Sequence, residues 1–559
     1  MTILEGYFRK LYARYGINQS THVQMAEIAG LFGCSIRNTR NMLNRMRENE
    51  WLLWQAKRGR GNSSSLRLLV TPESLFNQNI NGLLASQDVG KVLKFIGTEK
   101  NLLERIIQYK FGASGEGSET KVRIPYYRNL DVLNPLKPLR RTERHLLRQC
   151  LSGLTRYDPV RMEIVPDLAH YWSHDENYTH WEIFLKPTAM FSDGTTVKSH
   201  DVKKCLELAC SAPWFMSLFR MISEIDVVGD YRIMIKTHAP VKHLDFLLAT
   251  QPALIFDRHN DVMKCTGPFS IASNEEGFLT LRRNTHYHYA RPMLSEIDIF
   301  TWAPKHISMS FIPILHDEET HESDTLKERK LEHGCCFLLI DSKGLFAAEG
   351  SRKFINKTLQ PIEILDNSDL PEEYGSILSL AQGMLPEWNH KCVDFGTLAS
   401  PYVANRKIVL ATYQQPELVK LSNAMAMILK RYNYSVEVLV LQFSDFSTMQ
   451  NINADLWLTN FMVDNISSHS FLDWLSPDPV FKKLPEQFDR AYQQLQTDLL
   501  NVDIEDSKAC VETFFSGLTS QRWVIPLFHH WLELKSEKSF SWRDLNTLGW
   551  PDFSQLWSN

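Results

Sequence analysis

The chain has 559 residues, of which 43% are hydrophobic, 23% charged and 11% aromatic, and this globular composition excludes disordered and low-complexity classes. At about 100–200 residues per domain, the length predicts several domains. The longest apolar stretches are strand-length, shorter than the ~18 residues of a membrane-spanning helix, so we expect no membrane contact.

Cysteine usage and the start of the chain indicate a compartment. Nine cysteines at irregular spacing cannot form a complete intramolecular disulfide framework, and they favour free thiols in a reducing environment. Residues 1–10 lack the basic start and the apolar run of a secretory signal. We therefore expect a cytoplasmic protein.

The net charge of −4 conceals an asymmetry. Residues 1–70 hold eleven Lys or Arg against four Glu, a balance of +7, so the remaining residues carry −11. A small basic head on a large acidic body predicts that the head meets a polyanion.

The basic head has the pattern of a winged helix-turn-helix. Apolar residues recur at helical spacing over residues 3–16 and 23–32, and a tight turn at residues 33–35 precedes a third helix over residues 35–49. On that third helix, the residues expected to face the core of the head are Ile36, Met42, Leu43 and Met46. Two strand-like runs, residues 51–56 and 66–70, flank a basic, glycine-rich tip. A helix-turn-helix followed by such a hairpin predicts a DNA-binding head.

The polar face of the third helix carries the residue types that contact base edges. Arginine offers a fork to guanine and asparagine matches adenine, although a merely solvated helix face is the alternative. The expected DNA-binding residues on this helix and its cap are Ser35, Arg37, Asn38, Arg40, Asn41, Asn44 and Arg45. The cations of the wing tip, Lys57, Arg58 and Arg60, are expected to contact phosphates. We therefore expect double-stranded DNA as a partner.

A helical connector and a larger body follow the head. Residues 71–120 show helical stripes and end in the Gly- and Ser-rich segment 111–118, which is typical of a linker. From residue 121 to 559, strand-like and helical runs alternate, which predicts a mixed α/β body. The most specific stretch, residues 181–202, predicts a strand, an Asp-Gly turn, a second strand and a helix that begins near an aspartate.

Several of these sequence motifs resemble those of known protein families. The N-terminal domain of SgrR-type transcriptional regulators is resembled by residues 26–29, 34–35, 40, 43, 51–52, 54–56 and 59–61. Residues 528–531 and 546–550, near the end of the chain, resemble motifs specific to the same regulators. Residues 181–202 resemble the signature of solute-binding proteins of the peptide- and nickel-uptake type. The resemblance implies a winged helix-turn-helix at residues 1–70 fused to a two-lobed α/β domain of the periplasmic-binding-protein type, family 5, at residues 121–559. Lobe one would hold about residues 121–302 and 504–559, and lobe two about residues 303–503.

The resemblance also implies a function. We expect a regulator that senses a small-molecule effector, a sugar phosphate or a sugar, and controls stress or transport genes. The alternative is a solute- or oligopeptide-binding protein of an ABC uptake system. An enzyme is not expected, because the chain has no phosphate-binding loop, nucleophile elbow or dinucleotide fingerprint. The effector, the operator, the direction of regulation and the oligomeric state stay open.

The resembled family lines its ligand pocket from both lobes. Mapped onto this chain, the expected ligand-binding residues are Tyr126, Tyr127, Arg128, Trp457, Asn460, Phe461 and Asp464, each of which has a structural role as its alternative. Arg128, or Arg140 with Arg141, would pair with a phosphate or carboxylate. The histidines His529 and His530 are neighbours that point to opposite faces of a strand, and no zinc-type spacing occurs, so we expect neither metal nor cofactor.

Overall fold

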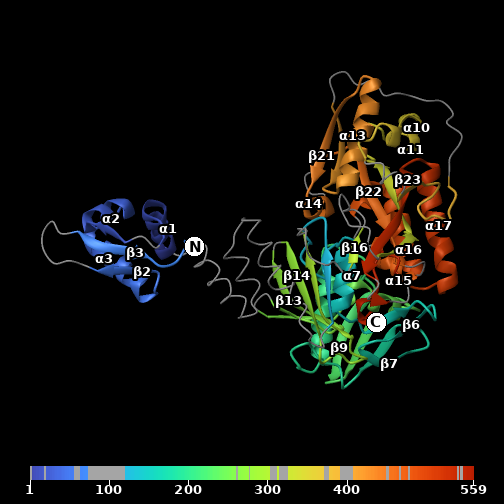
Figure 1. The fold of residues 1–559 in the computed structure, drawn as a ribbon. Coiled ribbons are helices and arrows are strands. Elements are labelled where there is room, and N and C mark those ends of the chain that lie inside the picture. Colours follow the sequence, from blue (N-terminus) through green and yellow to red (C-terminus); the bar gives the residue numbers. More distant parts are fainter. Residues whose placement is uncertain are drawn as a thin grey trace. The chain divides into compact units, whose positions relative to one another are not determined.

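The computed structural model divides into two compact units, one formed mainly by residues 1–117 and the other by residues 118–303 and 308–559 (Figure 1). The residues that the structure describes are 3–17, 20–55, 63–72, 120–259, 262–275, 277–301, 311–313, 325–370, 377–390, 407–448, 452–464, 468–475, 479–537, 540–541 and 545–558. Nearly all of the predicted connector, residues 71–120, therefore lies outside the described residues.

The first unit is a winged helix-turn-helix. Its helices are α1 (Ile3–Tyr15), α2 (Met25–Phe32) and α3 (Ile36–Glu48). Its sheet has the strand order β1-β3-β2, formed by β1 (Thr21–Val23), β2 (Leu52–Gln55) and β3 (Ser64–Leu68). Strand β1 is absent from the sequence prediction because three residues are too short to show periodicity. The predicted fold class of the head is confirmed.

The turn between α2 and α3 depends on two residues. Gly33 ends α2 at φ 66°, a left-handed conformation that favours glycine, and its N–H donates to the carbonyls of Ala29 and Gly30. Ser35 begins α3, since its hydroxyl accepts a hydrogen bond from the backbone N–H of Asn38 at 3.3 Å. The turn thereby fixes the orientation of α3 relative to α2.

The core face of α3 differs from the prediction at one position. Ile36 is 50% exposed, whereas Thr39 is fully buried with Leu43 and Met46. The buried stripe therefore follows positions 39, 43 and 46, and Ile36 at the helix start lies beside it. Thr39 tolerates burial because its hydroxyl donates to the carbonyl of Ser35 at 3.0 Å.

The second unit begins with two sheets. One has the order β13-β14-β15-β4, from β13 (Phe269–Glu275), β14 (Phe278–Arg283), β15 (Leu294–Phe300) and β4 (Thr120–Pro125), with β4 parallel to β15. The other has the order β7-β8-β10-β9, from β7 (Ala169–His174), β8 (His180–Leu185), β10 (Arg232–Thr237) and β9 (Ile222–Gly229). The predicted Asp-Gly turn places Gly194 at φ 85°, and Asp201 accepts the backbone N–H of Lys198 at the start of α8 (Ser199–Ser211). We call this part lobe one.

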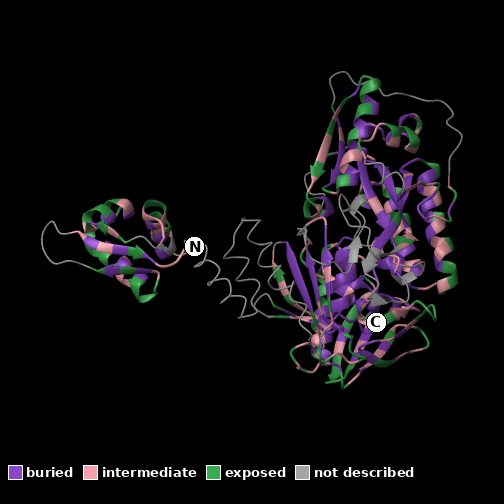
Figure 2. Cartoon of the chain, viewed as in Figure 1, coloured by how far each residue is buried: buried purple, intermediate pink, exposed green. Residues whose placement is uncertain are grey.

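Lobe two is built on a larger mixed sheet. Its main path among the described residues is β16-β23-β18-β22-β20-β21, and β17 (Thr325–Leu331) and β19 (Leu378–Leu380) also pair with β23. The path comprises β16 (Phe311–Pro313), β23 (Val524–Glu537), β18 (Gly334–Ile340), β22 (Leu456–Met462), β20 (Lys407–Tyr413) and β21 (Ser435–Leu441). Strand β18 is buried along its whole length, and Figure 2 shows buried residues, in purple, along many strands of the larger unit.

The boundary expected at residue 503 is wrong. Helix α17 (Ile504–Ser520) packs on α16 (Glu486–Leu499), and strand β23 pairs first with β18 in lobe two. The chain returns within β23, because Leu534 already belongs to the lobe-one core that also contains Val122, Leu545 and Trp550. The crossover therefore lies along this fourteen-residue strand, whose second half pairs with β17.

Free thiols and a lack of long apolar helices complete the description. The eight cysteines in the described part of the chain are all free. None of the described helices is both long and apolar enough to cross a membrane.

Candidate DNA-reading helix and ligand cavity

The polar face of α3 presents basic and amide side chains to solvent. Ser35, Arg37, Arg40, Asn41 and Arg45 are exposed, and Asn38 and Asn44 are half-buried. The guanidinium groups of Arg37, Arg40 and Arg45 form no ion pair with a described residue. The structure thus brings the seven predicted residues together at one helix and its cap. The predicted wing residues Lys57, Arg58 and Arg60 lie outside the described residues.

The second unit contains a cavity of about 170 Å³ between its two lobes. Lobe one contributes the segment after β4, the start of α7 (Arg141–Cys150) and the C-terminal segment. Lobe two contributes β22, β23, α13 (Pro416–Arg431), α14 (Phe443–Thr448) and α15 (Ser468–Leu475). Of the predicted residues, Tyr126, Tyr127, Arg128 and Asn460 line the cavity, as do Arg140 and Arg141.

Three of the predicted ligand-binding residues do not line the cavity. Trp457 and Phe461 are each an odd number of positions from Asn460 on β22, so they point to the opposite face of the strand. Trp457 is fully buried and donates its indole N–H to Asp341 at 3.2 Å, and the Phe461 ring packs on Phe515 with centroids 5.1 Å apart. Both belong to the hydrophobic core of lobe two.

Asp464, the third, lies behind the cavity wall. Its carboxylate accepts the indole N–H of Trp474 at 2.6 Å and lies 3.8 Å from Nε of Arg148. Trp474 itself lines the cavity. Asp464 therefore orients a lining residue and does not line the cavity itself.

An aromatic wall on the lobe-one side is held in place by one hydroxyl. The Tyr126 hydroxyl lies 2.7 Å from Oγ1 of Thr142, and the indole of Trp550 donates to the same oxygen at 3.1 Å. Burial raises the pKa of Tyr126, so its phenol stays protonated at neutral pH. Tyr126, Tyr127 and Trp550 thus form a preorganised apolar surface.

Arg128 is engaged by a buried carboxylate. Its two terminal nitrogens lie 2.5 and 2.8 Å from the oxygens of Glu143, which is fully buried. Burial by itself would raise the pKa of Glu143, but Arg128 outweighs that effect and lowers the pKa to about 2. Because both ends of its fork are occupied, Arg128 stiffens the wall and is not an open anion anchor.

Arg140 and Arg141 are the more open cations. Arg140 pairs with Asp131 at 2.8 Å, but its Nη1 is buried with no hydrogen-bond partner in the described structure. Arg141 is half-buried, lines the cavity and forms neither hydrogen bond nor ion pair through its side chain with any described residue. These two guanidinium groups can accept an anionic ligand group.

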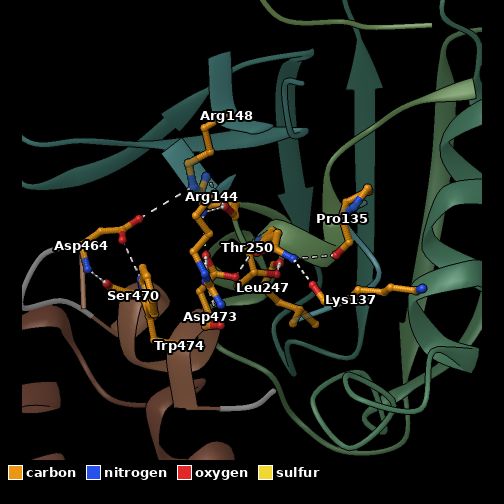
Figure 3. Close-up of polar contacts among 12 residues, drawn as sticks. Pro135, Lys137, Arg144, Arg148, Leu247, Thr250, Asp464, Ser470, Asp473 and Trp474 are labelled. Carbon is orange, nitrogen blue, oxygen red and sulfur yellow. Dashed lines mark hydrogen bonds and ion pairs between the residues drawn. The ribbon is translucent and has the colours of Figure 1, made fainter. Parts of the chain in front are cut away.

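A buried ion-pair network joins the lobes beside the cavity (Figure 3). Asp473 of α15 lies 3.1 Å from Arg144 and 2.7 Å from Arg148, both on α7, and it accepts the backbone N–H of Gln251 at 2.7 Å. The Arg144 guanidinium also lies 3.8 Å from the centroid of the Trp474 ring. Because Arg144 and Trp474 both line the cavity, the network fixes the position of one wall relative to the other.

Carboxylates dominate the opposite wall. Nε2 of His530 on β23 lies 2.5 Å from Glu417 of α13, and its Nδ1 bonds to Glu332, which follows β17. Burial would lower the pKa of His530, but the two carboxylates raise it well above its usual value, so the imidazolium persists at neutral pH. All three residues are at most 7% exposed and line the cavity.

The sequence prediction missed this cluster. His530 lies 198 positions from Glu332 and 113 from Glu417, so no local spacing connects them. No group of three or more His, Cys, Asp or Glu within the described ranges could hold a metal ion. Both nitrogens of the His530 imidazolium carry a proton and face carboxylates, so neither has a lone pair for a metal.

Comparisons with known proteins agree with this two-part architecture. The family model "Sugar transport-related sRNA regulator N-term" matches residues 4–117, and "Bacterial extracellular solute-binding proteins, family 5 Middle" matches residues 163–306. The HTH-type transcriptional regulator SgrR of Yersinia pseudotuberculosis serotype I (strain IP32953) is 28% identical over 573 residues, covering 99% of this chain and 98% of that protein. Over nearly its whole length the chain is therefore similar to SgrR regulators.

Solved structures show the fold of the larger unit. The oligopeptide-binding protein AppA from Bacillus subtilis has a TM-score of 0.63 at 12% identity and covers 79% of this chain and 99% of its own. A dipeptide-binding protein from Pseudoalteromonas sp. SM9913 has a TM-score of 0.63 at 12% identity, covering 79% of this chain and 100% of its own. The SgrR-type relatives are named regulators and the structural neighbours are named binding proteins, and neither group is named as enzymes.

Proposed function

We propose that this protein is a cytoplasmic, DNA-binding transcriptional regulator whose solute-binding domain senses a small metabolite, a sugar phosphate or a sugar, and controls stress or transport genes. The observation that carries the proposal is the exposed face of α3, whose arginines form no ion pair with a described residue. Exposed arginines on the third helix of a winged head are suited to binding DNA, because they can pair with its phosphates and form hydrogen bonds with the edges of its bases.

The residues of α3 divide into two roles. Arg37, Asn38, Asn41 and Asn44 contact base edges, where a bidentate pair discriminates by about 1–3 kcal/mol. Arg40, Arg45 and the Ser35 cap bind phosphates, and the wing cations Lys57, Arg58 and Arg60 add to that sequence-independent affinity.

The cavity supplies the sensing half. A phosphate would pair with Arg141 and with the open Nη1 of Arg140. A sugar ring would pack on Tyr126 and Tyr127, and its hydroxyls would hydrogen-bond to Asn460. In this proposal the two lobes close on the ligand, and that closure changes DNA binding by the head.

The first test separates base contacts from the rest of the head. Genome-wide footprinting of the tagged protein supplies the operator, and binding of operator and random DNA is then measured for Asn41→Ala and for Arg9→Ala, an exposed residue of α1. Asn41→Ala should lower the ratio of operator to random affinity by about 5- to 150-fold, and Arg9→Ala should leave it unchanged. An equal loss on both DNAs from Asn41→Ala contradicts the assignment.

The second test concerns the effector. Glucose 6-phosphate is titrated into the full chain with and without operator, because coupling between two sites must be reciprocal. A ligand that binds with the same affinity in both titrations is not the regulatory signal.

The alternative is a solute- or oligopeptide-binding protein of an ABC uptake system. It predicts peptide binding that operator DNA does not change and no operator in the footprint.

A further inference from the structure

Two charges in the cavity lack a counter-charge among the described residues. On the arginine side, Arg128 pairs with Glu143 and Arg140 with Asp131. Arg144 and Arg148 are matched by Asp473 and Asp464. Arg141 is the cation left over within the described part of this wall.

The opposite wall carries the reverse imbalance. The His530 imidazolium lies between the carboxylates of Glu332 and Glu417, so the cluster has a net charge of −1. The neighbouring Glu533 forms an ion pair with Arg329 and adds no net charge. Glu417 lies in the first turn of α13, where the helix dipole stabilises a carboxylate.

The free acceptor positions of this cluster face the cavity. Both carboxylates contact His530 through Oε1, and neither Oε2 accepts a hydrogen bond from a described residue. Neither Oε2 is fully buried, so both reach the open space that these residues line. Two carboxylate oxygens at the surface of a cavity are acceptors only.

We propose that the Glu332–His530–Glu417 cluster is a subsite for an ammonium group, and that the cavity takes a dipolar ligand whose anionic group lies at Arg141. The inference rests on the proposed function, since it assumes that this cavity is the effector site. Burying a net charge is unfavourable unless it is paired, and a ligand with one positive and one negative group compensates both walls. A neutral hydroxyl at the carboxylates would leave their charge unpaired. Amino-sugar phosphates and short peptides both provide such an ammonium group.

The test compares three probes on the full chain by calorimetry at pH 6.5: glucosamine 6-phosphate, glucose 6-phosphate and the dipeptide Ala-Ala. We expect glucosamine 6-phosphate to bind at least ten-fold more tightly than glucose 6-phosphate. Glu417→Gln and Glu332→Gln should each remove that preference and leave glucose 6-phosphate binding within about two-fold. Glu437→Gln, on the exposed strand β21, is the matched control and should change neither affinity.

A measurement on the unaltered protein covers the case in which these variants do not fold. Amines of this kind have a pKa of about 8, so raising the pH from 6.5 to 9 deprotonates the sugar amine. The preference for glucosamine 6-phosphate should then be abolished. A preference that persists at pH 9 contradicts an ammonium subsite.

The outcomes separate this inference from the proposed function. If glucose 6-phosphate binds as tightly as glucosamine 6-phosphate, the ammonium subsite is wrong and sugar-phosphate sensing stands. If only the dipeptide binds and Glu417→Gln weakens it, the subsite stands and the proposed effector class is wrong. If none of the three binds, both are overturned.

Discussion

Arginine has opposite surroundings in the two units. On α3 of the head, Arg37, Arg40 and Arg45 are solvent-exposed and form no ion pair with a described residue. Around the cavity, Arg144 is buried and Arg128 is half-buried, and carboxylates hold both. Exposed cations are screened by salt and cost little to keep, whereas buried ones need a fixed partner. The same residue type therefore serves adaptable polyanion binding in one unit and a preorganised wall in the other.

The largest effect should follow from breaking a buried pair. Glu143→Gln leaves Arg128 without its counter-charge, so the free energy of unfolding of the larger unit should fall by about 3–5 kcal/mol. Denaturant unfolding measures it. Glu163→Gln removes a partner of the exposed Arg161, at 3.5 Å, and should cost less than about 1 kcal/mol.

A double substitution sharpens that result. Replacing both partners, Arg128→Met with Glu143→Leu, removes the unpaired charge and should recover most of the lost stability. If Glu143→Gln and Glu163→Gln cost the same, the distinction between buried and exposed pairs fails for this protein.

A buried acid should make the larger unit less stable as the pH rises. Burial raises the pKa of Asp298 on β15 to about 6, although the Thr280 hydroxyl donates to it at 2.7 Å. The folded state therefore binds the proton more tightly than the unfolded state, and up to about 3 kcal/mol is lost between pH 4 and 6. Asp298→Asn should remove this loss and be the more stable form at pH 7.5, but not at pH 4, in thermal unfolding.

A half-buried acid gives the control with the opposite sign. Backbone and side-chain hydrogen bonds from His180 and Thr179 lower the pKa of Asp175 to about 2. Its contribution is present at neutral pH and is lost as the pH falls through that value, so Asp175→Asn should destabilise at pH 7 more than at pH 2. A shared pH dependence for both variants would contradict these assignments.

The head should respond moderately to loss of its helix cap. Ser35→Ala removes the acceptor for the Asn38 N–H and should lower the stability of the head by about 1 kcal/mol. Ser35→Gly, the matched variant, should cost only a few tenths of a kcal/mol. No loss of stability in Ser35→Ala would show that this hydrogen bond contributes nothing.

The smallest effect on stability should come from the exposed arginines. Arg40→Ala should change the free energy of unfolding by less than about 0.5 kcal/mol. It should nevertheless reduce the slope of log affinity against log salt concentration by about 0.9, because one phosphate contact is lost. Arg9→Ala removes the same charge from α1 and should leave the slope unchanged. A stability loss of several kcal/mol for Arg40→Ala would contradict the comparison between the units.

The sequence by itself determined the head and the class of the body. Local patterns include the helical stripes, the Gly33 turn and the Asp-Gly motif at residues 181–202. Local hydrogen bonding and periodicity determine such elements. The exposed face of α3 follows from the same periodicity, with Ile36 and Thr39 exchanged at its border.

Only the tertiary structure decided what the cavity contains. Strand register places Asn460 toward the cavity and turns Trp457 and Phe461 into the core, and the pairing of β23 moves the lobe boundary from 503 into that strand. Glu332, Glu417 and His530 meet across more than a hundred positions of chain. Such meetings depend on how distant elements pack, because a side chain's charge partner is set by tertiary contacts and not by its neighbours in sequence.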